Sequence, residues 1–352
     1  MNIIIFLAIL VLLIIVHELG HFIVAKRARV GVDEFAVGFP PRIWGVRKGE
    51  TLYALGALPI GGYVKIRGED GGSHDDPRSL ASKPRLVQAA VLLGGVTMNA
   101  LLGWALISGG LMLGLPISDS ALPEGYQLNN PATIITSVSA DSPAARAGVN
   151  SGDTVLAINT LENPTIENVK SIVERSPGGV EFTLLSDGIS RTVVVTPEKS
   201  GGEQRVGVSL DRIGTLQLSI PNAVISGLSM TVSLVWATLS ALVEIIRSLF
   251  AGAPALEALT GPVGLVGLVG TARGLGFIYL ISLTAIISVN LAVVNLLPFP
   301  ALDGGRLLVL AIEGMLRRPL PAPLTGALHL AGFIVLIALM LLITVRDIHN
   351  LY

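Results

Sequence analysis

The most chemically informative residues of this sequence are two histidines and a glutamate near its amino terminus. His17, Glu18 and His21 fit the pattern H-E-x-x-H, in which histidines at i and i+4 fall on one face of a helix. Two imidazoles placed in this way can bind one zinc ion, and the glutamate beside them can reach a water molecule on the metal. The alternative is a helix whose polar residues face the interior of a bundle. Three ionisable groups in an apolar helix each cost about 2.5 kcal/mol or more, which favours a metal site.

A catalytic zinc site has three protein ligands and one open position, so a third ligand must come from elsewhere in the chain. Asp303 is the strongest candidate. It follows an apolar segment that Pro298 and Pro300 interrupt, and two glycines that permit a tight turn come directly after it. The alternative for Asp303 is to cap the helix that follows. This ligand set favours zinc, although two histidines and one aspartate also accept other divalent ions.

The elements that must position these residues are membrane-spanning helices. The chain has 352 residues, of which 51% are hydrophobic and 14% are charged, and its mean hydropathy is +0.71. This composition is too apolar for a soluble protein of this length. We therefore predict about four transmembrane helices, near the length of about 20 residues that crosses a bilayer. Their predicted ranges are residues 2–25, 86–115, 277–297 and 327–345.

Residues 221–250 form another apolar segment, for which two interpretations are open. Glu244 and Arg247 are spaced i,i+3, so they lie on one face of a helix. Such a pair suits an amphipathic helix in the interface, or a helix packed against the bundle, at least as well as a lipid-facing span. The prediction of four spans treats this segment as membrane-associated.

The charges and the absence of cysteine exclude some classes of function. The formal net charge is −1, which gives no reason to expect a nucleic-acid partner. There are no cysteines, so disulfides and thiolate metal sites are excluded.

The positions of the basic residues predict the orientation in the membrane. Eleven Lys or Arg lie between Lys26 and Arg85, and three more follow the third predicted span, so both of these loops should be cytoplasmic. The insert between spans two and three and both termini then lie outside the cytoplasm, and the histidine motif lies near the cytoplasmic side.

Residues 129–212 have the composition of a small soluble domain. Short β-branched runs at 134–138, 154–158, 180–185 and 192–196 alternate with turn residues, and 165–174 has a helical pattern. The segment from Ser142 to Asn159 resembles the middle of a PDZ domain. That resemblance implies a peptide groove at a sheet edge, with Val206, Gly207 and Val208 in the carboxylate-binding loop of a circularly permuted order.

The cytoplasmic loop at residues 30–70 is predicted to form membrane-associated β-hairpins, because Gly and Pro alternate with short strand-like runs between Glu34 and Ile66. A strand edge at membrane depth must be buried in protein or pair with an added strand. The predicted organisation is a first membrane part at 1–115, the PDZ insert at 129–212 and a second membrane part at 213–352.

His17–His21 in the first span, together with Leu302-Asp303-Gly304 beside the third, resembles the site-2 protease family of intramembrane zinc metalloproteases. The resemblance covers nearly the whole chain. Further motifs, with a single PDZ insert, are similar to the bacterial regulator-of-sigma-E protease branch. These motifs are Gly61-Gly62-Tyr63-Val64 and Gly261-Pro262-Val263-Gly264.

The resemblance implies specific roles for several residues. His17, His21 and Asp303 would bind Zn²⁺, and Glu18 would be the catalytic base. The first-loop hairpins would hold the substrate as an extended strand, and the implied substrate-binding residues are Asn290, Asn295, Gly61, Gly62 and Tyr63. For the two asparagines, helix–helix hydrogen bonding is the alternative.

The implied function is regulated intramembrane proteolysis of single-span membrane proteins, such as anti-sigma factors or signal-peptide remnants, in the bacterial plasma (inner) membrane. The implied partners are the transmembrane substrate, a peptide or protein carboxy terminus at the PDZ domain, and membrane lipid. A non-catalytic PDZ adaptor and a metal transporter are the alternatives. Relatives commonly have Gly-Pro before the asparagine of the second span, whereas this chain has Gly94-Gly95-Val96-Thr97-Met98-Asn99, so the resemblance gives no firm role to Asn99.

Overall fold

The structure, a computed structural model, describes residues 1–69, 75–123, 125–186, 188–200, 202–251, 260–318 and 320–349. The chain forms two compact units. The first contains residues 1–110 and 224–352, and the second contains residues 111–223, so the second unit is inserted into the first. The residues expected to form the soluble insert, 129–212, lie within the second unit.

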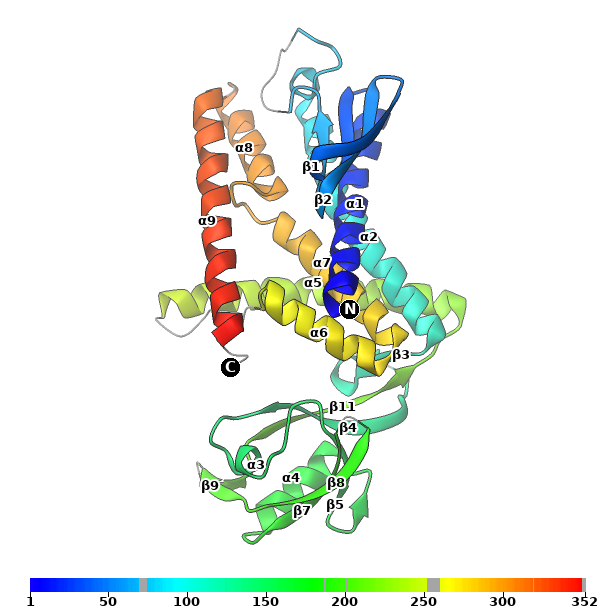
Figure 1. The fold of residues 1–352 in the computed structure, drawn as a ribbon, viewed down its shortest axis with the longest axis vertical. Helices are drawn as coiled ribbons and strands as arrows, with labels where there is room; N and C mark the ends of the chain where they lie inside the picture. The colour runs from blue at the N-terminus through cyan, green and yellow to red at the C-terminus, as the bar shows by residue number, and fades with distance from the viewer. Residues whose placement is uncertain are drawn as a thin grey trace. The chain divides into compact units, whose positions relative to one another are not determined.

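Long apolar helices dominate the first unit (Figure 1). Among the described residues, five helices are long and apolar enough to cross a membrane. Four of them overlap the predicted spans, two of which extend two residues beyond the helix end, and the fifth, α5, covers the segment 221–250 that was left open. The five helices are α1 (Asn2–Arg27), α2 (Arg85–Leu113), α5 (Ile220–Phe250), α7 (Phe277–Asn295) and α9 (Ala322–His349).

Two shorter helices flank α7, namely α6 (Pro262–Leu275) and α8 (Asp303–Leu316). Helix α6 begins at Pro262, whose fixed φ suits the first turn of a helix. Asp347 of α9 accepts a hydrogen bond of 2.9 Å from the amide of Gly264, so α9 supplies an acceptor that the start of α6 lacks. The Gly261-Pro262-Val263-Gly264 motif therefore fastens α6 to α9.

A two-stranded antiparallel sheet follows α1 and consists of β1 (Val32–Lys48) and β2 (Thr51–Ile66). The first part of β1 pairs on one side with 62–66 and on the other with 52–55, while its last part pairs with 51–56. The described strands thus give four short segments in the order 62–66, 32–37, 51–56 and 42–48. The predicted β-structure of this loop is confirmed, and apolar side chains of β1, β2, α1 and α2 pack together beneath it.

Among its described residues, the second unit consists of antiparallel strands and two short α-helices. Its main sheet has the order β3-β11-β4-β5-β7-β8, and β6 pairs with β5. The predicted strands and the predicted helix are present. The strands are β3 (Leu115–Ser118), β4 (Asn129–Val138), β5 (Thr154–Ile158), β6 (Leu161–Glu162), β7 (Val180–Ser186), β8 (Ile189–Val195), β9 (Glu198–Ser200), β10 (Glu203–Arg205) and β11 (Val208–Leu216).

The helices of the second unit are α3 (Pro143–Arg146) and α4 (Ile166–Arg175). Thr165 and Asn168 form a capping box at the start of α4, which explains why the helix begins there. Val169 and Val173 of α4 are buried against the sheet in a core that includes Ile135, Ile158 and Leu184. This unit therefore has a hydrophobic core of its own.

Candidate metal centre

Three side chains converge inside the first unit. His17 and His21 lie one turn apart on α1, and Asp303 comes from the first turn of α8. The Nε2 atoms of the histidines are 3.1 Å apart, and Asp303 Oδ2 lies 3.1 Å from His17 Nε2 and 3.4 Å from His21 Nε2. The two histidines are buried, and the Asp303 side chain is 15% exposed. These three residues form a possible metal site.

The separations between these atoms fit a tetrahedral zinc site. Ligands about 2.0–2.1 Å from zinc at tetrahedral angles lie about 3.3 Å from one another. The three contacts of 3.1, 3.1 and 3.4 Å bracket that value. Asp303 Oδ2 is also a buried acceptor without a well-aligned hydrogen bond among the described residues. The residues present therefore fit the metal that their chemistry suggests.

The turn before α8 places Asp303 at this point. Gly304 and Gly305 lie so close to the backbone of the turn that a Cβ on either would come within 2.2 Å of a carbonyl oxygen. Only glycine permits this approach. Asp303 is the first residue of α8, Leu302 occupies the cap position, and no side-chain cap is present. The carboxylate thus faces the histidines instead of capping the helix.

The two imidazoles also determine the charge of Asp303. Burial alone would raise the pKa of its carboxyl, but the neighbouring imidazoles of His17 and His21 outweigh that effect and hold the pKa well below its usual range. Metal binding itself requires an ionised carboxylate and neutral imidazoles.

Helix α2 packs against the two histidines of α1. The ring nitrogen Nδ1 of His21 lies 2.8 Å from the carbonyl oxygen of Val91, and Nδ1 of His17 lies 3.3 Å from the side chain of Asn99. A Cβ at Gly95 would lie within 2.6 Å of both imidazoles, and one at Gly20 within 2.1 Å of the carbonyl of Gly94. Sequence analysis missed these contacts, although adjacent glycines in an apolar helix are a signal for close helix packing.

Glu18 has an ionic environment. It follows His17 on α1 and interacts electrostatically with both histidines, Asp303 and Glu69. Glu69 follows β2 and pairs with Arg306 of α8. The glutamate of the motif thus lies in the same charged region as the three possible ligands.

The predicted substrate residues come from two elements of the first unit, α7 and β2. Asn290 of α7 lies 2.7 Å from the Thr238 hydroxyl of α5, which is the helix–helix hydrogen bond considered as its alternative role. Asn295 is the last residue of α7. Gly61, Gly62 and Tyr63 lie in β2.

The glycines of β2 allow close packing around Phe39 and α1. A Cβ at Gly61 would lie 2.4 Å from the Phe39 ring, and one at Gly62 would lie 3.6 Å from Ile14 of α1, one turn before His17. Tyr63 stacks on Phe39, with the ring centroids 6.3 Å apart. Burial, together with the neighbouring carboxylate of Glu34, raises the pKa of the Tyr63 hydroxyl.

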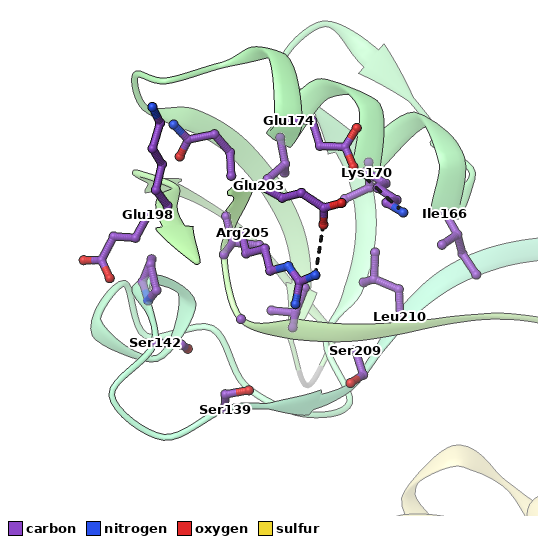
Figure 2. Close-up of a pocket in the computed structure, with 18 residues that line it drawn as sticks. Ser139, Ser142, Ile166, Lys170, Glu174, Glu198, Glu203, Arg205, Ser209 and Leu210 are labelled. Atoms are coloured by element: carbon purple, nitrogen blue, oxygen red, sulfur yellow. Dashed lines mark hydrogen bonds and ion pairs between the residues drawn. The ribbon is translucent and has the colours of Figure 1, made fainter. Parts of the chain in front are cut away.

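The predicted carboxylate loop lies at one end of a groove in the second unit. Figure 2 shows this groove, which has a volume of about 770 Å³, between α4 and the start of β11. Gly207 has φ +79°, and the carbonyls of Val206 and Gly207 accept hydrogen bonds from the amides of Ala144 and Ser139. The loop is therefore held in place by its carbonyls, and Val208 begins β11 beside the groove.

A buried set of two histidines and one aspartate, joined to apolar helices of membrane-spanning length, is the arrangement expected of a membrane metalloprotein. The sequence profile of Peptidase family M50 matches residues 5–339, and the chain belongs to this site-2 protease (M50) family. A Clostridium acetobutylicum protein named as a proposed zinc metalloprotease is 32% identical over 99% of this chain and 97% of its own length. Zinc metalloprotease RasP of Geobacillus kaustophilus is 29% identical over 100% of this chain and 98% of its own length.

These comparisons identify the protein as a zinc metallopeptidase and a multi-pass membrane protein. The family match therefore favours a peptidase over the two alternatives drawn from the sequence, which were a non-catalytic PDZ adaptor and a metal transporter.

Proposed function

We propose that this protein is an intramembrane endopeptidase that cuts single-span membrane proteins within or beside the bilayer. The observation that carries the proposal is the convergence of His17, His21 and Asp303 around one point, with Glu18 adjacent, on apolar helices. Three ligands leave one position of a tetrahedral site for water or substrate, as catalytic zinc requires.

In this mechanism, His17, His21 and Asp303 hold the zinc ion. When bound, zinc supplies Lewis-acid chemistry by activating water and polarising the scissile carbonyl. The carboxylate of Glu18 accepts the proton of the attacking water, and its protonated form then donates that proton to the leaving amine. Burial of the three ligands and their packing against α2 keep the reacting groups in a fixed geometry.

The substrate must unwind before it is cut, because a helix hides its carbonyls in internal hydrogen bonds. Segment 62–66 of β2 can supply an extended partner. Among the described residues its only strand partner is β1, so the backbone groups of its other edge have no strand partner and could pair with an added strand. Gly62 lies against α1 one turn before His17, which supports substrate binding at Gly61, Gly62 and Tyr63. Asn290 and Asn295 of α7 complete the proposed substrate contacts.

The second unit acts as a PDZ domain in this proposal and screens what reaches the metal site. The groove between α4 and β11 supports it, because residues 208–212 of β11 pair with β4 on one side and β3 begins to pair only at Ile213. A peptide carboxy terminus would add there as a strand, with its carboxylate at Val206, Gly207 and Val208.

We propose four spans in the bacterial plasma (inner) membrane, namely α1, α2, α7 and α9. Within the first unit, α5 lies across the direction of α1 and α9, which supports an interfacial helix in place of a fifth span (Figure 1). The basic loops then lie in the cytoplasm with the metal site near that side, and both termini and the PDZ domain lie outside it. Anti-sigma factors and signal-peptide remnants are the proposed substrates.

The test uses purified full-length protein in detergent with a single-span substrate and bound zinc measured in every variant. We expect Glu18→Gln to retain zinc but lose cleavage, and Asp303→Ala to lose both. Glu244→Gln, which removes a charge on the exposed face of α5, is the matched control and should cut as well as wild type. Cleavage by Glu18→Gln at the wild-type rate would refute the assignment of the base.

A further inference from the structure

Asn99 of α2 is a fully buried polar residue beside the metal centre, with 0% of its surface exposed. Its backbone carbonyl accepts a hydrogen bond of 2.8 Å from the hydroxyl of Ser288 on α7. Its side-chain nitrogen lies 3.3 Å from Nδ1 of His17, whereas its side-chain oxygen has no partner among the described residues. A buried side chain with an unpaired oxygen beside a ring nitrogen calls for a chemical explanation.

The tautomer of His17 supplies that explanation. Nε2 of His17 faces Nε2 of His21 and Oδ2 of Asp303, so Nε2 is the atom that can bind a metal. In a neutral imidazole that binds through Nε2, Nδ1 carries the proton and is a donor. The amide nitrogen of Asn99 is also a donor, so two donors would face each other. The oxygen and the nitrogen of an asparagine amide have nearly the same size and shape. Rotating the Asn99 amide by half a turn therefore keeps its packing and places the unpaired oxygen against Nδ1–H.

We propose that Asn99 is a positioning residue for His17. Its side-chain oxygen accepts the Nδ1–H hydrogen bond, selects the tautomer that leaves Nε2 free, and fixes the orientation of the ring toward the metal. This inference deepens the proposed function and rests on its metal site.

The other histidine shows the same arrangement. Nδ1 of His21 lies 2.8 Å from the carbonyl oxygen of Val91, also on α2. Since α1 and α2 run in opposite directions, the earlier histidine meets the later residue of α2. Helix α2 thus supplies the hydrogen-bond partner of Nδ1 for both histidines. For His21 the partner is a backbone carbonyl, and for His17 it is a side chain. Only the bond to His17 depends on residue type, so only that bond can be removed by substitution.

The test measures zinc affinity of the full-length protein in detergent by competition with a chromophoric chelator. Asn99→Leu keeps a similar volume but has no acceptor, and we expect it to bind zinc about 10- to 100-fold more weakly. Asn99→Asp keeps an oxygen acceptor, so its affinity should stay within about threefold of wild type or rise. Ser108→Ala, which changes another buried polar residue of α2, is the control and should bind like wild type.

A role in packing alone would not distinguish the variants in this way, because the bond from Ser288 goes to the backbone and survives every substitution. Equal zinc affinity of Asn99→Leu and wild type would overturn the proposal. So would a loss of affinity in Asn99→Asp as large as that in Asn99→Leu, and this comparison decides the matter if the leucine variant does not fold. If wild type bound zinc no better than Asp303→Ala, the proposed metal site itself would fail, together with this inference.

Discussion

The contact between Gly95 and the two imidazoles leads to a quantitative prediction for Gly95→Ala. A Cβ at this position would lie 2.5 Å from Nε2 of His21 and 2.6 Å from Nε2 of His17. Comfortable contacts between non-bonded heavy atoms begin at about 3.5 Å, so the rings or the helix must move by about 1 Å. The atoms that must move are the nitrogens proposed to bind the metal, so the displacement falls on the ligand set itself.

A shift of this size exceeds what a metal site tolerates. Ligand distances in genuine sites stay within about 0.2 Å of their ordinary values, so a ligand must loosen. Loss of an outer-shell partner alone costs about 10- to 100-fold in affinity or activity. We therefore expect Gly95→Ala to bind zinc at least about 100-fold more weakly, which corresponds to about 2.8 kcal/mol, and to lose peptidase activity in parallel.

The matched control is Gly109→Ala on the same helix, where no atom lies within 4 Å of an added Cβ. Zinc affinity is measured by chelator competition, and the melting temperature of the metal-free protein is measured beside it. Wild-type affinity in Gly95→Ala would refute the proposed position of α2 against the ligands. An equal loss of zinc affinity in Gly95→Ala and Gly109→Ala would show that alanine is harmful at either glycine of α2. It would then give no support to a specific contact between Gly95 and the imidazoles.

Three further predictions concern helix packing and the metal. Gly20→Ala, whose Cβ would lie 2.1 Å from the carbonyl of Gly94, should force α1 and α2 apart and lower the melting temperature of the metal-free protein, and an unchanged melting temperature would contradict that contact. Asp347→Ala should lower stability by about 1 kcal/mol in thermal denaturation because the start of α6 loses its acceptor, whereas Asp347→Asn should lose less. Chelation should abolish cleavage with little change in helix content by circular dichroism, and zinc should restore it; cleavage that survives complete metal removal would exclude a metallopeptidase mechanism.

Local spacing explains why part of the site could be predicted from the sequence. His17, Glu18 and His21 belong to one helix, so the periodicity of that helix alone places the histidines on one face. Asp303 could be proposed because few ionisable residues lie near the apolar segments and because the turn before it is rich in proline and glycine. The structure brings all three possible ligands together. Local sequence patterns could not predict this, because it depends on how α8 packs against α1 in the tertiary structure.

The contribution of α2 could not be predicted in the same way. The acceptor for His21 is the backbone carbonyl of Val91, a group that every residue carries, so its side chain gives no signal. The importance of Gly95 depends on what lies opposite it, which is a property of tertiary packing. Helix α6 was also missed because its glycines, such as Gly267 and Gly270, have low helix propensity, and packing against neighbouring helices compensates for that.

The distance along the chain between the possible ligands has a consequence for biosynthesis. About 280 residues separate His21 from Asp303, and the second unit lies between them. At a synthesis rate of about 5–20 residues per second, the aspartate leaves the ribosome roughly 15–60 s after the histidines. Throughout that interval the nascent chain carries the histidine pair without its third ligand. Under the proposed ligand set, a newly made molecule therefore has no complete zinc site until Asp303 has been synthesised.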